Sequence, residues 1–198
     1  RDWTGSIAQW IRRLDRETPC GWIVDLRRNF GGDMWPMLDG IAPLLPDGIA
    51  GGVAMPRRST PVHWWIVNGR AYSAVPVLAG LDFIRGSRRL RNGAAPVAVL
   101  LDAHTASSGE AVAIAFVGRA RTRSFGRATA GLTTANTTVS LPDGTRAAIT
   151  VGVDIDRHGR RYGGAVRPDV AVLDSAMVRS EAATWLRATC AQVPPNHS

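Results

Sequence analysis

The sequence predicts an α/β fold. Two short apolar runs, residues 21–27 and 96–102, have the length and composition of buried parallel strands. Helical patterns accompany them, with apolar residues recurring at helical spacing over 6–16 and a capped apolar run over 107–118. Strands alternating with helices, with hairpins added between them, are typical of α/β domains. A β-rich excursion and a hairpin are therefore expected around an α/β core.

The chain length favours a single domain. Its 198 residues, 45% of them hydrophobic, can bury one full core, and a second independent domain would be hard to fit. We expect residues 1–190 to form this domain. The residues "QVPPNHS" at the end carry no periodic pattern, so 191–198 are expected to be a disordered tail.

The first half of the chain contains a helix, a strand, a second helix and a β-rich stretch. The first helix has one apolar face, formed by Ile7, Trp10, Ile11 and Leu14. The strand runs into "NFGGD", whose glycine pair permits an unusual turn. The second helix is expected over 34–45, with Pro36 in its first turn. Alternating residues predict strands within 47–75.

The second half repeats this alternation. After the capped helix, "PDG" marks the turn of a hairpin. The expected elements, in order, are a short helix over 81–92, the strand 96–102, the helix 107–118, a strand over 121–126, the hairpin 137–154, an extended stretch over 166–172 and a closing helix over 175–189.

The composition argues against several classes of protein. All 24 basic residues are arginines, and the formal net charge is +8. Because the arginines are scattered as short pairs without a basic run, we do not expect nucleic-acid binding. No apolar stretch is long enough to span a bilayer. Cys20 and Cys190 match no metal spacing, and whether they pair is left open.

Two loops carry the residues that suit chemistry. Residues 25–32 follow the first buried strand and residues 102–110 follow the second. The carboxyl ends of such strands converge on one crevice. Ser107 opens a helix, where the positive end of the dipole favours developing negative charge. Backbone amides from the glycine pair Gly31 and Gly32 complete the parts of an oxyanion hole, which indicates acyl transfer.

Each of these residues also has a plain structural interpretation. Ser107 and Ser108 fit a capping serine followed by a helix residue. Glu110, three positions after Ser107, fits the acidic partner of a capping box. Gly31 and Gly32 fit a tight turn.

Five linked motifs resemble the tail-specific (carboxy-terminal processing) serine peptidase family over residues 5–172. They are, in order, "GWIVDLRRNFGGDMWPML", "TASSGEAVAIAF", "RSFGRATAGLTTAN", "LPDGTRAAITVGVD" and "GGAVRPDV". The resemblance implies a crotonase/ClpP-like core and hydrolysis of peptide bonds in a peptide or protein substrate, with no metal and no organic cofactor. It implies Ser107 as nucleophile, with Gly31, Gly32 and the amide of Ser108 as the oxyanion hole. Relatives commonly work outside the cytoplasm.

The sequence departs from this family at its general base. The family lysine falls where this chain has Leu132, and the sequence contains no lysine. A branch resembling the nisin-resistance proteins has "TASS" with a nearby glutamate, and pairs its serine with a histidine upstream of the "DLR" strand. We therefore expect the general base to lie before residue 1, in a longer peptidase. In this branch Glu110 helps to hold the substrate, which stands as an alternative to its capping role.

Other bases and other functions remain open. His104 is three residues before Ser107 and reaches its hydroxyl only if the turn folds back. The remaining histidines, His63, His158 and His197, are poor substitutes. Because the lysine is missing, the principal alternative is a non-catalytic protein that binds a peptide or small molecule on the same fold. A nucleic-acid binder is the third alternative, and it requires steeply salt-dependent affinity.

Overall fold

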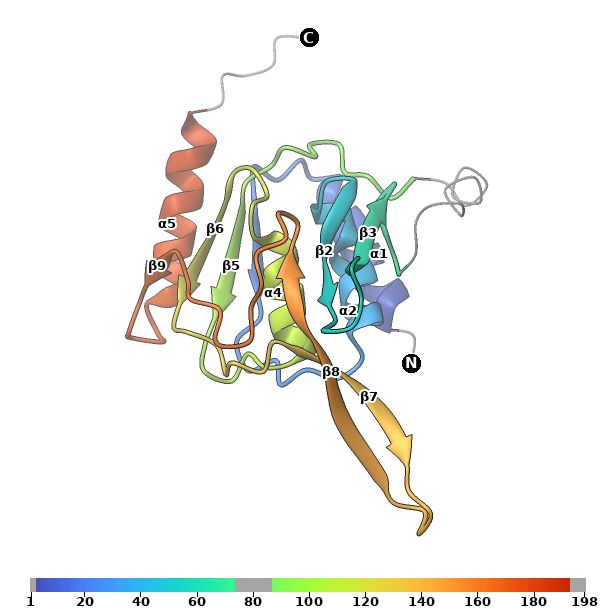
Figure 1. Ribbon diagram of the computed structural model, residues 1–198. Coiled ribbons are helices and arrows are strands. Elements are labelled where there is room, and N and C mark those ends of the chain that lie inside the picture. The colour runs from blue at the N-terminus through green and yellow to red at the C-terminus, as the bar shows by residue number, and fades with distance from the viewer. Residues whose placement is uncertain (1–2, 74–86, 193–198) are drawn as a thin grey trace.

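The computed structural model describes residues 3–73 and 87–192, which form an α/β molecule with two sheets beside a central helix, α4 (Figure 1). The predicted mixture of helices and strands is confirmed. The helical elements are α1 (Trp3–Asp15), α2 (Met34–Ile41), the 3₁₀ turn η1 (Ala42–Leu44), α4 (Ser108–Phe116) and α5 (Val178–Ala191). The strands are β1 (Trp22–Asp25), β2 (Gly48–Ala54), β3 (Val62–Val67), β4 (Arg70–Tyr72), β5 (Val97–Leu101), β6 (Thr122–Gly126), β7 (Thr134–Ser140), β8 (Arg146–Asp156) and β9 (Val170–Ala171).

The first sheet is parallel and has the strand order β1-β5-β6-β9. Strand β5 is buried on both faces, as its unbroken apolar sequence predicts. Val97, Val99 and Leu101 belong to the main core, whereas Ala98 and Leu100 pack with α5 on the opposite face. Because β1 and β5 run parallel side by side, the loops that follow them leave from the same edge of the sheet.

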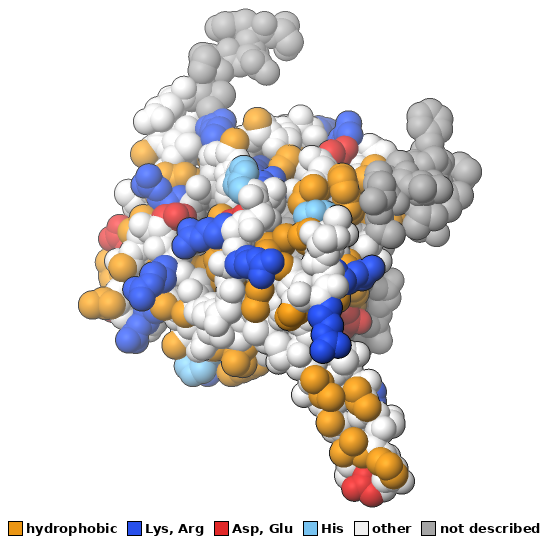
Figure 2. All heavy atoms as spheres, viewed as in Figure 1, with side chains coloured by type: hydrophobic (Ala, Val, Ile, Leu, Met, Phe, Trp, Pro, Cys, Tyr) orange, Lys and Arg blue, Asp and Glu red, His pale blue; other side chains and the backbone are white. Residues whose placement is uncertain are grey.

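The second sheet is antiparallel and has the order β4-β3-β2-β8-β7. It contains the strands expected within 47–75 and the predicted hairpin. The hairpin β7–β8 extends beyond the body of the molecule (Figure 1), and hydrophobic side chains are visible along it (Figure 2). Its turn uses Gly144 at a φ of +83°, a conformation that glycine adopts readily.

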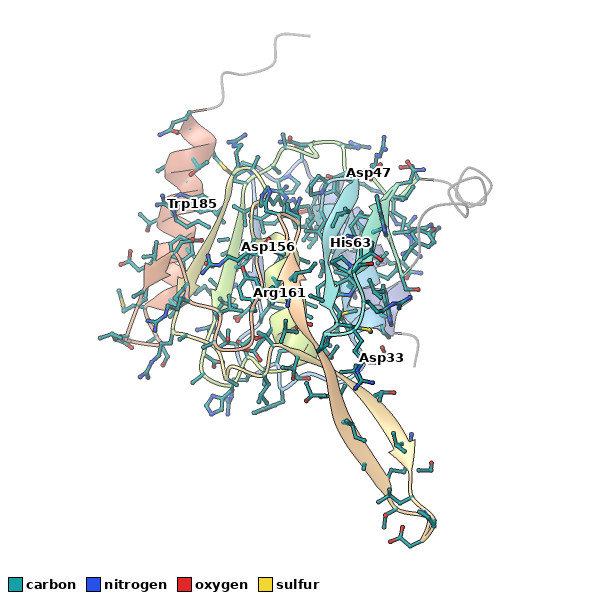
Figure 3. All side chains as sticks on the ribbon, in the orientation of Figure 1. Asp33, Asp47, His63, Asp156, Arg161 and Trp185 are labelled. Carbon is teal, nitrogen blue, oxygen red and sulfur yellow. A yellow bond between two sulfur atoms is a disulfide. The ribbon has the colours of Figure 1, made fainter. Side chains whose placement is uncertain are left out.

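Helix α5 closes the far face of the parallel sheet. Its Trp185 lies against Phe125 of β6, with ring centroids 5.7 Å apart, and is labelled in Figure 3. The helix extends to Ala191, slightly beyond the predicted range. Apart from residues 191 and 192, the predicted tail lies outside the described residues.

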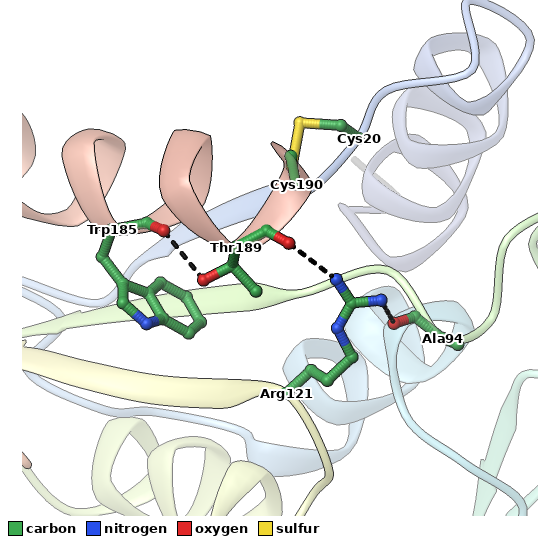
Figure 4. The surroundings of a disulfide bond; sticks show 6 residues. All are labelled: Cys20, Ala94, Arg121, Trp185, Thr189 and Cys190. Carbon is green, nitrogen blue, oxygen red and sulfur yellow. Dashed lines mark hydrogen bonds between the residues drawn. A yellow bond between two sulfur atoms is a disulfide. The ribbon is translucent and has the colours of Figure 1, made fainter. Parts of the chain in front are cut away.

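A disulfide joins Cys20 and Cys190, the pair that the sequence left open (Figure 4). It links the loop before β1 to the last turn of α5 across 170 residues of chain. Beside it, Arg121 donates one hydrogen bond to the carbonyl of Thr189 at 3.2 Å and another to that of Ala94 at 3.4 Å. The C-terminal helix is therefore fixed to the body both covalently and by hydrogen bonds.

Three predicted elements need correction. The apolar face expected for α1 is only partly buried: Ile11 is in the core, but Trp10 is 60% exposed and Leu14 also faces solvent. The guanidinium of Arg13 covers the Trp10 ring instead, 5.4 Å from its centroid. The helix expected over 34–45 is α2 followed by η1, because Pro43 cannot donate a helical hydrogen bond. Of the helix expected over 81–92, residues 81–86 lie outside the described residues and 87–92 are not helical.

Candidate active site

An ion pair between Asp25 and Arg27 stabilises the start of the loop after β1. Arg27 makes two side-chain hydrogen bonds to the carboxylate of Asp25, at 2.9 and 2.7 Å. Burial acts to raise the pKa of Asp25, but its hydrogen bonds with Arg27 lower the pKa below the ordinary value. These two residues therefore fix the end of the strand.

The loop after β5 is organised by Asp102. Its carboxylate accepts hydrogen bonds from the backbone amides of Arg28, His104 and Thr105. Burial raises the pKa of Asp102, whereas these three amides lower it, and the net result lies below the ordinary value. Because one of the amides comes from the loop after β1, Asp102 holds the two loops together.

Further contacts bring both loops to one place. The hydroxyl of Thr105 donates to the carbonyl of Leu26 at 2.9 Å, and the amide of Ala106 donates to the carbonyl of Asn29 at 2.9 Å. The glycine at 109 leaves room for Asn29, since a Cβ there would come within 2.7 Å of the Asn29 carbonyl oxygen. The two loops therefore lie together at the carboxyl ends of β1 and β5, as the strand order predicted.

Ser107 is the N-cap of α4 and has an unusual backbone, with φ of +51° and ψ of −121°. A serine rarely adopts this conformation, which costs on the order of 1–3 kcal/mol. Ser107 and Ser108 are half-buried. The positive end of α4 lies beside the Ser107 hydroxyl, so the site favours negative charge there.

Gly31 packs directly against Ser107. A Cβ at Gly31, whose φ is +97°, would lie 2.9 Å from the carbonyl oxygen of Ala106 and 3.0 Å from the Cβ of Ser107. The amide of Gly31 donates to the side chain of Asn29 at 3.0 Å. Gly31 therefore shapes the loop, while its own donor is already engaged.

Two other amides beside or within these loops have no protein acceptor in the part of the chain that the structure describes. Within the described residues, neither the amide of Gly32 nor that of Ser108 donates to a protein acceptor. The Ser108 amide lies near Gly31, only 3.1 Å from where its Cβ would stand, and the Ser108 hydroxyl donates to the Gly32 carbonyl at 2.6 Å. The turn at Gly31 and Gly32 therefore contacts both Ser107 and Ser108.

Glu110 is 0% exposed and lies under the Ser107 turn. Its carboxylate accepts hydrogen bonds from the amides of Ser107, Gly131 and Leu132, at 2.9, 2.8 and 2.7 Å, and from the hydroxyl of Thr129. A carboxylate with four donors and no exposed surface cannot contact a substrate directly. This geometry favours a supporting role over the substrate-holding role that the resemblance allowed.

Glu110 also anchors the segment that contains Leu132. The Leu132 side chain, which occupies the position of the family lysine, is 56% exposed at the edge of the site. Behind Glu110, Asp154 on β8 is buried, and burial together with the charge of Glu110 raises its pKa to about 7.

The sequence reasoning did not identify Asn29, Thr129 or Asp154, which join this network. Asn29 stands directly before "FGG", and an asparagine at the start of a turn was an available signal. Thr129 and Asp154 lie within two of the quoted motifs, but nothing in either motif marks them as neighbours of Glu110.

The histidines are not positioned as bases in the described residues. His104 is 63% exposed, with Nδ1 3.7 Å from a carboxylate oxygen of Asp102 and its ring against Phe30. It makes no hydrogen bond to Ser107 among the described residues. The Nδ1 of His63, labelled in Figure 3, is buried without a hydrogen-bond partner. His158 is exposed on a turn, and His197 lies outside the described residues.

Neither a metal-binding cluster nor a membrane-spanning helix occurs in the described ranges. Between residues 3 and 73 and between 87 and 192, no group of three His, Cys, Asp or Glu side chains is arranged to hold a metal ion. In the same ranges no helix combines the length and the apolar composition needed to cross a bilayer.

Comparisons with known proteins agree with the motifs. The sequence model described as Peptidase family S41 matches residues 1–172. The chain is 36% identical over 176 residues to a nisin-resistance protein of Lactococcus lactis subsp. lactis, covering 88% of this chain and 52% of that protein. It therefore spans about half the length of this curated relative.

Solved structures show the same similarity. A lipoprotein from Streptococcus agalactiae superposes with a TM-score of 0.68 at 30% identity, covering 94% of this chain and 62% of that one. The photosystem II D1 C-terminal processing protease gives a TM-score of 0.65 at 26% identity, covering 89% of this chain and 40% of that one.

Proposed function

We propose, since this chain belongs to peptidase family S41, that it forms the core of a serine peptidase in which Ser107 is the nucleophile. Family membership supports a peptidase activity on a protein or peptide substrate. The observation that carries the assignment to Ser107 is its position at the positive end of α4, against the turn at Gly31. The amides of Gly32 and Ser108, next to this contact in the chain, have no protein acceptor in the described residues. The core is assigned to the crotonase/ClpP type, supported by its parallel sheet and the α4 turn.

In the proposed reaction the Ser107 oxygen attacks the carbonyl carbon of the scissile peptide bond. Its proton passes to a general base, and the carbonyl oxygen becomes an oxyanion that accepts hydrogen bonds from the amides of Gly32 and Ser108. Collapse of the tetrahedral intermediate breaks the C–N bond, and the amine leaves with a proton. Water then hydrolyses the acyl-enzyme and restores the Ser107 hydroxyl.

The general base is proposed to lie before residue 1. The chain has no lysine, and Leu132 stands where the family carries one. No described histidine is hydrogen-bonded to Ser107. The curated relative is about twice the length of the matched region, so such proteins have room for a base elsewhere.

An extracytoplasmic location is proposed for the protein. A disulfide persists in oxidising compartments and is rare in the cytosol, and Cys20 is joined to Cys190. One of the similar structures is described as a lipoprotein, and the curated relative as a nisin-resistance protein. Both descriptions are those of proteins at the cell envelope or outside it.

A fluorophosphonate probe, which reacts with activated serines, tests the assignment. Wild type should be labelled slowly, because the proposed general base lies outside residues 1–198, and Ser107→Ala should not be labelled. The matched control Ser140→Ala, on the exposed hairpin, should be labelled at the wild-type rate. Equal labelling of wild type and Ser107→Ala would remove Ser107 from the mechanism. Absence of labelling in all three, with specific binding of peptides, would favour the non-catalytic alternative.

A further inference from the structure

A cavity of about 710 Å³ lies apart from the Ser107 turn. It is enclosed by β5, β6, the C-terminal half of α4 and the segment 160–169. Phe116, at its inner end, is nine residues along α4 from Ser107, which places the two about 14 Å apart along the helix axis. The volume is within the range of pockets that hold small organic molecules.

The inner wall of this cavity is apolar. Val99 and Leu101 reach it from β5, and Ala113 and Phe116 reach it from α4. All four side chains are buried. An apolar wall of this kind favours a ligand with a hydrocarbon body, since water gains little from contact with it.

The rest of the lining is strongly basic. Four arginines contribute to it, namely Arg119, Arg160, Arg161 and Arg167. Asp169 is the one acidic residue of the lining, and its carboxylate already accepts two hydrogen bonds from Ser124. Figure 2 shows basic side chains gathered over the middle of this face, and Figure 3 labels Arg161 there.

Arg119 places an uncompensated charge at the base of the cavity. It is only 8% exposed and has no carboxylate partner within the described residues. Burial, together with the charges of Arg157 and Arg121, lowers its pKa to about 10. Its donors all go to neutral oxygens, those of Gly93, Leu44, Ala95, Ala120 and Thr122. An anion in the cavity would relieve this accumulation of like charge.

The other arginines of the lining have guanidinium N–H groups that can still donate to a ligand. Arg161 and Arg167 are exposed, and their guanidinium groups form no ion pair or hydrogen bond within residues 3–73 and 87–192. Arg160 rests over the ring of Tyr162, 5.6 Å from its centroid. A planar guanidinium with free donors is the group that proteins use to bind carboxylates and phosphates.

We propose that this cavity binds an amphipathic organic anion, with a carboxylate or phosphate head held by Arg161 and Arg167 and an apolar body against Phe116 and Val99. The site is distinct from the proposed catalytic centre, because Ser107 and its oxyanion amides do not line it. The cavity has the size of a single small ligand, so a nucleic-acid strand is not its occupant.

Isothermal titration calorimetry of residues 1–198 at fixed ionic strength tests this proposal. Octanoate and octyl phosphate should each bind at one site, and their relative affinity identifies the preferred head group. Inorganic phosphate, which lacks the apolar body, should bind at least about tenfold more weakly. Octyltrimethylammonium, which carries the same tail with the opposite charge, should not bind.

Two double variants distinguish binding by the cavity arginines from a general effect of the protein's net charge. Arg161→Gln with Arg167→Gln should weaken octanoate or octyl phosphate binding by about tenfold or more. Arg57→Gln with Arg58→Gln removes the same charge from an exposed turn and should leave affinity unchanged. The proposal fails if neither octyl anion binds, if the octyl cation binds as well as the anions, or if both double variants lose affinity equally.

Discussion

The carboxylate of Glu110 accepts a hydrogen bond from the backbone amide of Ser107 at 2.9 Å. This hydrogen bond links the candidate nucleophile to the loop that contains Leu132. The same carboxylate accepts a hydrogen bond from the amide of Leu132 at 2.7 Å. The conformation of Ser107 is unfavourable for a serine, so it needs such support from its surroundings. Glu110 thus supports the backbone conformation of the Ser107 turn.

Glu110→Gln should weaken this support. A glutamine has an NH₂ group in place of one carboxylate oxygen of Glu110. Because an NH₂ group cannot accept a hydrogen bond, at least one buried donor loses its acceptor. We expect the free energy of unfolding to fall by about 1–3 kcal/mol and fluorophosphonate labelling of Ser107 to slow. Chemical denaturation and labelling kinetics measure both effects. Glu17→Gln, at an exposed position, is the control, and equal effects of the two variants would be evidence against this role.

Gly31→Ala should lower stability and slow the labelling of Ser107 by more than the strain of a positive φ alone would cause. Both Gly31 and Gly144 have positive φ, at +97° and +83°, but only at Gly31 would a Cβ meet other atoms. We expect Gly144→Ala to cost about 1–2 kcal/mol of stability without affecting labelling of Ser107. Gly31→Ala should cost more and slow the labelling. Similar results for the two variants would show that the close approach to Ser107 is unimportant.

Removal of the disulfide should destabilise the fold. Cys20→Ser with Cys190→Ser frees the last turn of α5 from the body, and we expect a loss of about 2–4 kcal/mol. Denaturation with and without a reducing agent measures it. Reductant should lower the stability of wild type and leave the double variant unchanged. A wild type that is insensitive to reductant would show that the bond does not form in solution.

Stability should depend on pH through Asp154. Its pKa rises from 3.8 to about 7 on folding, because the carboxyl is buried beside Glu110. Between about pH 4 and 7 the folded chain keeps a proton that the unfolded chain releases. The free energy of unfolding should therefore decrease as the pH rises through this window, by on the order of 4 kcal/mol in full. Asp154→Asn should flatten the dependence, and an unchanged slope in that variant would refute the assignment.

Residues 1–198 by themselves should hydrolyse peptides slowly. A positioned general base contributes about 10²–10⁴ in rate, and no described histidine is hydrogen-bonded to Ser107. Turnover of a fluorogenic peptide by wild type and by His104→Ala measures this. Rapid turnover that His104→Ala abolishes would identify His104 as the base and overturn the proposal that the base lies elsewhere.

The sequence predicted the fold well where local pattern decides it. The unbroken apolar run of β5 predicted a buried parallel strand. Because β1 and β5 are parallel neighbours, the loops that follow them leave from one edge of the sheet. The partial exposure of α1 was not predicted, because the apolar spacing of Trp10 and Leu14 does not show whether another element packs against them. Only tertiary structure supplies that information.

The candidate site was predictable in part. The contact of Gly31 with Ser107 and Ser108 followed from motif order and strand direction. The engagement of the Gly31 amide by Asn29, and the burial of Glu110, depend on loop conformations that no local pattern specifies. The roles of these residues in catalysis remain predictions.

A crystal structure of the protein after reaction with a fluorophosphonate tests the central claim most directly. The phosphorus should be bonded to the Ser107 oxygen, with the phosphoryl oxygen about 2.7–3.1 Å from the amides of both Gly32 and Ser108. An adduct on another residue, or a phosphoryl oxygen turned away from these two amides, would contradict it.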